Sequence, residues 1–154
     1  MSTNLDYYPA ESMGGHYGNK KARQLYKMSA IIKFDDYMSH QVYAAADFYL
    51  MPSLFEPCGL SQLIAMRYGV VPVVRKTGGL GDTVSHFEPE TGQGHGIVFN
   101  DYLASALLWA TDRALSIYHH RDQFDAVRRN AMQANFSWEA SAQEYLRLYE
   151  TLRS

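Results

Sequence analysis

The segment Phe55–Gln62, which reads FEPCGLSQ, places a carboxylate, a thiol and a glycine between two apolar stretches. Glu56 offers a negative charge and hydrogen-bond acceptors, and Cys58 offers a sulfur nucleophile. Pro57 restricts the backbone between them and Gly59 frees it. Corners between a buried strand and a helix are where open α/β sheets bind their ligands. We therefore expect this segment to form a site.

Cys58 has two interpretations. A thiolate near a helix N-terminus is a candidate nucleophile. A thiol enzyme also needs a base held within reach, and no spacing in the sequence pairs any of the six histidines with Cys58. We therefore interpret Cys58 as a small, half-buried residue whose backbone N–H matters more than its sulfur. This single cysteine excludes an internal disulfide and suits a reducing compartment.

Glu56 is the stronger candidate for chemistry. It lies three residues before an expected helix start at Gly59, where a carboxylate favours the helix dipole by less than about 1 kcal/mol at most exposed sites. That dipole role does not explain why Pro57 and Gly59 shape the same turn. The alternative is a carboxylate that contacts a ligand at the open edge of the sheet.

Two glycine-rich stretches differ in their context. Lys76–Thr83 follows the apolar run VVPVVR, and its pair Gly78 and Gly79 would let backbone N–H groups approach an anion closely. A tight turn with nothing bound explains this stretch equally well, so both interpretations stay open. Gly92–Gly96 instead precedes a strand, whereas a dinucleotide fingerprint follows one, so we interpret it as a flexible loop.

The apolar pattern predicts strands that alternate with helices, and hence a mostly parallel sheet. The expected strands are Ala30–Phe34, Asp47–Pro52, Val70–Arg75 and Gly96–Phe99. The expected helices are Tyr37–Ala46, Gly59–Tyr68 with Gly69 as its cap, and three more, over 103–118, over 124–134 and from the N-cap Ser137 onward. We expect Asp47–Pro52 to be buried on both faces, Pro72 to mark a strand start or a bulge, and the aromatic residues of the last helix to pack in the core.

Composition excludes several classes of protein. A chain of 154 residues with 47% hydrophobic residues can bury the core of one domain. Its net charge of −2 and lack of a basic patch argue against nucleic acid as a partner. No apolar run approaches the roughly 18 residues of a spanning helix, and the N-terminus does not resemble a signal peptide. His119 and His120 are adjacent, which gives no metal-ligand spacing. We expect a soluble, cytoplasmic α/β domain without a metal.

Three stretches together resemble the bacterial glycogen synthases and plant starch synthases. They are Leu50–Leu63 with EPCGL, Arg67–Gly69, and Val73–Leu80 with TGGL, followed by Asp82. The resemblance runs from about Ile32 to the end and includes the FSW start of the last helix. It is specific, because EPCGL and TGGL occur in the family's order and at its separation, whereas more distant sugar-nucleotide transferases share only a looser Glu-Pro-x-Gly.

The resemblance implies a fold and a reaction. Residues 29–154 would be part of the Rossmann-like C-terminal, nucleotide-sugar-binding domain of a GT-B glycosyltransferase, with 1–28 an unassigned tail and short helix. Such enzymes transfer glucose from ADP-glucose to the non-reducing end of an α-1,4-glucan with retention. ADP-glucose is a substrate, and no cofactor is expected.

The resemblance also implies roles for individual residues of the two motifs. Glu56 would be the catalytic carboxylate and would hydrogen-bond the donor glucose, while Cys58 and Gly59 would hold the sugar through backbone N–H groups. The diphosphate would contact Leu60 and Ser61, with Gly78 and Gly79 contributing to nucleotide binding, and Phe34 would lie against the adenine.

This chain departs from the family's pattern. It contains neither the N-terminal GT-B domain, with its Lys-x-Gly-Gly-Leu loop, nor the first strand of the C-terminal domain, which leads to an arginine and a lysine at the diphosphate. Ile64 stands where looser relatives, though not the synthases, carry a second glutamate. We therefore expect either part of a longer enzyme, inactive alone, or a changed position for the strand at Ala30–Phe34. The alternatives are a non-catalytic nucleotide- or glucan-binding remnant and a transferase that uses another sugar nucleotide.

Overall fold

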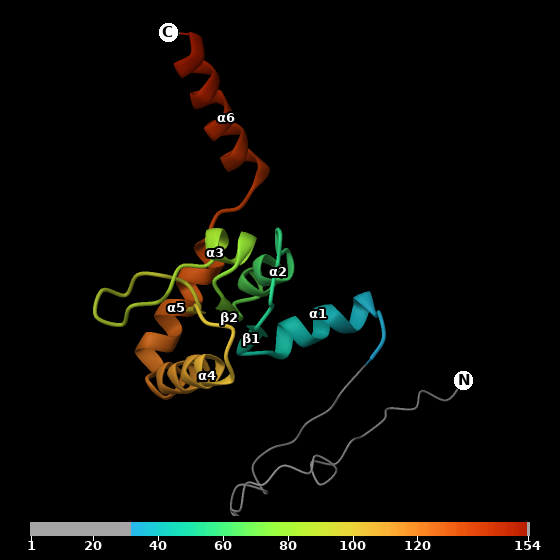
Figure 1. Cartoon of the computed structure of the whole chain (residues 1–154), viewed down its shortest axis with the longest axis vertical. Helices are drawn as coiled ribbons and strands as arrows, with labels where there is room; N and C mark the ends of the chain where they lie inside the picture. Colours follow the sequence, from blue (N-terminus) through green and yellow to red (C-terminus); the bar gives the residue numbers. More distant parts are fainter. Residues whose placement is uncertain (1–31, 154) are drawn as a thin grey trace, which may run out of the picture. The chain divides into compact units, whose positions relative to one another are not determined.

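The structure, a computed structural model, describes residues 32–153. Its chain divides into two units, Met1–Asp36 and Tyr37–Ser154. The second unit contains a parallel sheet of three strands in the order β1-β2-β3 (Figure 1). The strands are β1 (Phe48–Met51), β2 (Val71–Arg75) and β3 (Ile97–Phe99). The predicted α/β class with a parallel sheet is therefore confirmed.

Six helices are present in the described residues. They are α1 (Asp36–Ala45), α2 (Ser61–Arg67), α3 (Gly78–Thr83), α4 (Ala104–His119), α5 (Arg121–Gln133) and α6 (Trp138–Arg153). The sequence had indicated all of them except α3. A helix lies in each connection between consecutive strands, because parallel neighbours need a crossover. Gly69 follows α2 with a φ of 76°, and the Ser137 hydroxyl accepts the Ala140 N–H at the start of α6, so both predicted caps are confirmed.

The sheet is covered on two faces because successive residues of β2 point in opposite directions. Val71 and Val73 belong to one buried cluster, together with Phe124 and Val127 of α5 and residues of α4. Val74 belongs to the other, with Leu80 of α3. Pro72 is the second residue of β2, and the pairing with β1 continues through it without a bulge.

The predicted first strand is wrong where the structure describes it. Ala30 and Ile31 lie outside the described residues, and residues 32–34 form no strand. Ile32 and Phe34 are 94% and 95% exposed, so no burial stabilises an extended pairing there. The prediction that β1 is buried on both faces is also wrong. Leu50 is 47% exposed, because among the described residues β1 pairs with β2 alone.

Helix α6 does not pack as predicted. Its apolar residues recur at helical spacing, but none of them is buried. Trp138 is 87% exposed and Leu152 is 76% exposed. A periodic apolar stripe predicts a buried face and not its partner, and no described residue covers this one.

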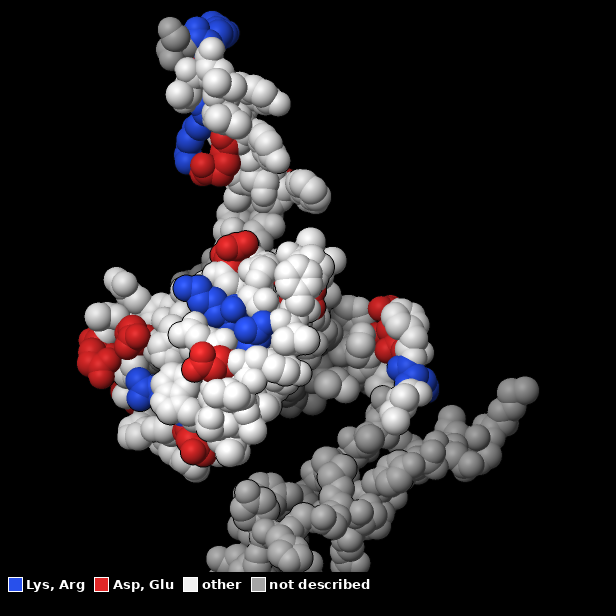
Figure 2. Space-filling model, in the orientation of Figure 1, with Lys and Arg blue, Asp and Glu red and all other residues white. Residues whose placement is uncertain are grey.

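Charges are mixed on the face seen in Figure 2, where acidic and basic groups lie among each other. Over residues 32–153, no helix is long and apolar enough to cross a membrane.

Candidate functional site

The segment Phe55–Gln62 forms the corner between β1 and α2, at the carboxyl end of the parallel strands. Helix α2 begins at Ser61, two residues later than predicted. Gly59 precedes it with a φ of 70°, a conformation that favours glycine. Open α/β sheets bind ligands at this end of their strands, so the fold places the predicted segment where a ligand is expected.

Arg75 holds the start of this corner. Its Nε donates to the Ser53 carbonyl at 2.8 Å, and a terminal nitrogen donates to the Leu54 carbonyl. The other terminal nitrogen donates to the Asn100 carbonyl at 3.3 Å. The guanidinium also lies over the Tyr102 ring, with its central carbon 5.6 Å from the ring centroid. One side chain at the end of β2 therefore joins the segments that leave all three strands.

The TGGL segment packs against the corner backbone to backbone. The Gly79 N–H donates to the carbonyls of Glu56 and Pro57, at 3.1 and 3.2 Å. A Cβ on Gly79 would lie 1.9 Å from the Cys58 carbonyl oxygen, and one on Gly78 would lie 2.1 Å from that of Glu56. No side chain larger than hydrogen fits such a contact. Both glycines are therefore needed for this packing, whether or not a ligand is present.

The hydrogen bonds of the corner are one-sided. Carbonyls of the corner and of the two residues before it accept hydrogen bonds, namely those of Ser53, Leu54, Glu56, Pro57, Gly59 and Leu60. In contrast, the backbone N–H groups of Cys58, Leu60 and Ser61 have no partner among the described residues. Unpaired N–H groups at a helix start can bind an anion. The corner therefore keeps unpaired donors near the helix start, while most of its carbonyls already accept hydrogen bonds.

Glu56 is half-buried, and its carboxylate takes part in the same turn. The Gly59 N–H donates to Glu56 Oε1 at 3.1 Å, while Oε2 has no partner among residues 32–153. This bond stabilises the turn before α2, as the scaffold interpretation requires. One carboxylate oxygen remains for a ligand, so the ligand-binding interpretation also stays a prediction.

The other predicted site residues are distributed unevenly. Cys58 is exposed, so its expected half-burial is wrong; the turn directs its thiol outward. The Ser61 hydroxyl lies 3.4 Å from the Met51 sulfur. Leu60 is 70% exposed beside them. Phe34 belongs to the unit Met1–Asp36, and its role against a base stays a prediction.

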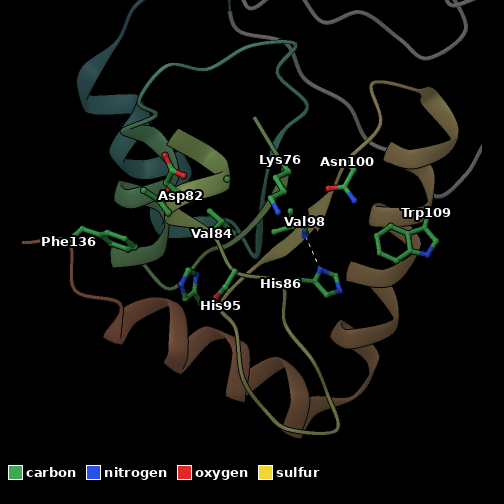
Figure 3. A pocket seen from close by; sticks show the side chains of 12 residues that line it. Lys76, Asp82, Val84, His86, His95, Val98, Asn100, Trp109 and Phe136 are labelled. Carbon is green, nitrogen blue, oxygen red and sulfur yellow. Dashed lines mark hydrogen bonds between the residues drawn. The ribbon is translucent and has the colours of Figure 1, made fainter. Parts of the chain in front are cut away.

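A pocket of ≈ 570 Å³ lies beside α3 and β3 (Figure 3). Lys76 and Asn100 follow the ends of β2 and β3, and Asp82 of α3 faces the same space. Because Lys76 and Asp82 carry opposite charges, the pocket has no preference for an anion. Among the described residues, no cluster of three or more His, Cys, Asp or Glu could hold a metal ion.

Two histidines, His86 and His95, line this pocket. The Val98 N–H donates to His86 Nδ1 at 3.0 Å, so the imidazole carries its proton on Nε2. Burial lowers the pKa of His86, with the Arg113 charge acting in the same direction and Glu88 opposing. Burial also lowers the pKa of His95, whose Nδ1 is buried without a partner among residues 32–153. The His86 ring stacks with Trp109 at 5.9 Å between centroids.

Sequence comparison now places the chain in a family. Residues 18–131 match the family described as glycosyl transferases group 1. The chain belongs to this family. The match begins upstream of Ile32, so the resemblance is longer at its N-terminal end than the motifs alone had indicated.

Relatives of this group 1 glycosyl transferase carry consistent names. The glycogen synthase of Clostridium botulinum (strain Alaska E43) is 50% identical over 136 residues, which cover 88% of this chain and 27% of that protein. The glycogen synthase of Bacillus anthracis is 47% identical over 126 residues, 82% of this chain and 26% of that protein.

Solved structures agree with the fold. The catalytic domain of starch synthase IV from Arabidopsis thaliana, bound to ADP and acarbose, is similar with a TM-score of 0.67 and 40% identity, over 77% of this chain and 25% of that one. Sucrose-phosphate synthase from Thermosynechococcus elongatus has a TM-score of 0.50 and 32% identity, over 71% and 26%. This chain therefore spans about a quarter of the length of the relatives it matches.

Sequence reasoning missed three residues that organise the site in this glycosyl transferase. They are Gln62, Arg75 and Thr83, which hold the corner through hydrogen bonds. A weak signal was available for two of them. Gln62 is a polar residue at a buried position of α2, and Arg75 ends an otherwise apolar strand. Their partners are backbone carbonyls, which sequence does not identify.

Proposed function

We propose that this chain forms the nucleotide-sugar-binding part of an enzyme that transfers glucose from ADP-glucose to the non-reducing end of an α-1,4-glucan, with retention of configuration. The one-sided hydrogen bonding of the corner between β1 and α2 carries this proposal. Relatives named glycogen synthase support the reaction, and the Arabidopsis structure bound to ADP supports the nucleotide.

The diphosphate of the donor would bind at the unpaired N–H groups of Leu60 and Ser61. A helix start offers a diphosphate both N–H donors and the positive end of the helix dipole. The carbonyls of the corner that already accept hydrogen bonds also favour anion binding, because a free carbonyl oxygen facing the ligand would repel the charge of the phosphate. We expect Gly78 to lie near the nucleotide, with Gly79 acting through the corner that it packs against.

The donor glucose would lie beside Glu56 and Cys58. Departure of the nucleotide leaves positive charge at the anomeric carbon, and a fixed carboxylate stabilises that charge most in the transition state. The free Oε2 of Glu56 is the atom that we assign to this role. The Cys58 N–H would donate to a sugar hydroxyl, and its thiol takes no part.

The remaining partners complete the proposal. The acceptor is a glucan, and the second wall of the cleft is the N-terminal GT-B domain of the full-length enzyme. We propose a cytoplasmic location and no cofactor, with Phe34 against the adenine.

Transfer of labelled glucose to glycogen tests the reaction. The 154-residue chain should give no incorporation, because proximity of donor and acceptor accounts for roughly 7 to 11 kcal/mol of a barrier and needs both walls. A chimera in which this chain replaces the matching segment of the C. botulinum glycogen synthase should be active. An inactive, folded chimera would contradict the proposed reaction, and turnover by the chain alone would contradict the need for a second wall.

Calorimetric titration with ADP and with UDP tests the nucleotide. We expect the chain to bind ADP more tightly than UDP. Tighter binding of UDP would favour a transferase that uses another sugar nucleotide.

A further inference from the structure

Five residues at the corner form a closed ring of hydrogen bonds. The Gly79 N–H donates to the Glu56 carbonyl at 3.1 Å, and the Thr83 hydroxyl donates to the Gly79 carbonyl at 2.6 Å. Gln62 Nε2 donates to Thr83 Oγ1 at 3.0 Å and to the Gly59 carbonyl at 2.7 Å. The Gly59 N–H closes the ring at Glu56 Oε1, at 3.1 Å.

Each donor in this ring has a single consistent direction. The Gly59 carbonyl can only accept, so one hydrogen of the Gln62 amide points to it. The Thr83 hydroxyl gives its hydrogen to the Gly79 carbonyl, so its oxygen accepts the second Gln62 hydrogen. Reversing the Gln62 amide would place its oxygen against the Gly59 carbonyl oxygen. The ring therefore fixes the orientation of Gln62.

Gln62 is costly for the fold, which points to a role beyond packing. It is fully buried, and its Oε1 has no hydrogen-bond partner among the described residues. An unpaired buried amide oxygen destabilises a protein, whereas an apolar side chain of similar size would not. A Cβ on Gly59 would also lie 2.6 Å from Gln62 Oε1, so the amide packs closely against the turn.

We infer that Gln62 and Thr83 are positioning residues, which hold the Glu56 carboxylate and the unpaired N–H groups of the corner in their binding geometry. This inference rests on the proposed function, since it assigns Glu56 a role at the donor sugar. Both residues act through their neighbours: Thr83 fixes Gly79, which fixes the Glu56 backbone, and Gln62 fixes Gly59, which orients the Glu56 carboxylate.

Thr83→Val in the active chimera tests the inference with a matched control. Valine keeps the shape of threonine and removes both hydrogen bonds of the hydroxyl. Thr111→Val is the control, because Thr111 also donates to the carbonyl four residues earlier, at 2.9 Å, but in α4. We expect Thr83→Val to lower kcat by about 10- to 100-fold, as small misplacements of reacting groups do. Thr111→Val should leave kcat within about twofold.

A double substitution separates positioning from general loosening. If Thr83 acts through the Glu56 carboxylate, Thr83→Val should change kcat by less than about threefold in a Glu56→Gln background. Gln62→Met, which removes the amide and retains the length of the side chain, should follow the same pattern. Equal losses in both backgrounds, or an equal loss in Thr111→Val, would overturn the inference.

Amide hydrogen exchange in the 154-residue chain supplies a readout that needs no activity. The Gly79 and Gly59 amides should exchange at least about tenfold faster in Thr83→Val than in the wild type, and at the wild-type rate in Thr111→Val. Unchanged exchange at both glycines in Thr83→Val would overturn the ring. An inactive wild-type chimera with this exchange pattern would contradict the proposed function and leave the ring supported.

Discussion

The two glycine-rich stretches of this chain, Lys76–Thr83 and Gly92–Gly96, make similar close backbone contacts, but we assign them different roles. Gly79 packs on the corner, and a Cβ there would lie 1.9 Å from the Cys58 carbonyl oxygen. Gly94 packs on the segment before β3, and a Cβ there would lie 2.0 Å from the His86 carbonyl oxygen. Close backbone approach is therefore common to both stretches and does not by itself indicate a ligand.

The corner on which Gly79 packs differs from the second stretch in the hydrogen-bond partners of its backbone N–H groups. In the second stretch, the N–H groups of Gly92, Gln93, His95 and Gly96 have partners within the loop or beside it, and only that of Gly94 has none among the described residues. Asn130 donates to the carbonyls of this loop as well, at Gly92 and Gly94. In the corner, by contrast, the N–H groups of Cys58, Leu60 and Ser61 near the helix start have no partner among the described residues. Unpaired donors, and not glycine content, distinguish the candidate anion site from the structural loop.

Replacing one glycine in each stretch should give the largest effects, and it tests whether the two stretches differ in function. Gly79→Ala and Gly94→Ala both force a Cβ onto a carbonyl, so each should destabilise the fold by at least about 3 kcal/mol. Only Gly79→Ala should also abolish ADP binding, measured by calorimetry at a temperature where both variants are folded. Equal loss of ADP affinity in Gly94→Ala would show that the two stretches are not functionally distinct.

Glu56→Gln should separate catalysis from folding within the corner. Glutamine retains an oxygen that can accept the Gly59 N–H, so the melting temperature by circular dichroism should hardly change. Loss of the charge should lower kcat of the chimera by roughly 10² to 10³, as at other sites of electrostatic stabilisation. Near-normal kcat with a lower melting temperature would assign Glu56 to the scaffold.

The pH dependence of stability should report on His95 of the second stretch and on His86, which precedes it. Burial lowers the pKa of His86 and His95 in the folded state, so the unfolded state binds more protons near the usual histidine pKa of about 6.5. The free energy of unfolding should therefore be highest above about pH 6.5 and decline as the pH falls below it. Urea unfolding between about pH 7.5 and 5 measures this slope.

The substitution His86→Asn tests whether His86 contributes to this slope of stability against pH. Asparagine can place an amide oxygen where Nδ1 accepts the Val98 N–H, yet it does not titrate. The slope should become shallower in His86→Asn. A slope that His86→Asn leaves unchanged would remove His86 as its cause.

Cys58→Ser should have the smallest effect. The side chain is exposed and the proposed contact is the backbone N–H, which serine retains. We expect kcat of the chimera to stay within about threefold of the wild type. A loss of a thousandfold or more would support a thiol mechanism instead.

Local patterns predicted much of this fold. Helices α1, α2, α4, α5 and α6, and the strands β1 to β3, follow from apolar periodicity and caps. Burial was predicted less well, because it depends on partners. Leu50 in β1 and Trp138 in α6 belong to apolar patterns that no described residue covers.

The sequence predicted the position of the candidate site better than the contacts that hold it together. Its position follows from a strand-to-helix corner with Glu56 and Gly59. Its organisation depends on two contacts between segments far apart in the chain, the bonds of Arg75 to the carbonyls of Ser53 and Leu54 and the bond of Gln62 to Thr83, so only the fold identifies them. The glycines illustrate the same limit, since sequence left open whether Gly78 and Gly79 serve a ligand or a tight contact.

Titration of the isotope-labelled 154-residue chain with ADP, followed by amide NMR, tests whether the corner between β1 and α2 binds the diphosphate. We expect saturable shifts at the amides of Leu60 and Ser61, which we assign to the diphosphate, with the amides of residues 92–96 unchanged. Saturable shifts at 92–96 with none at the corner, or no shift at the corner at millimolar ADP, would contradict this assignment.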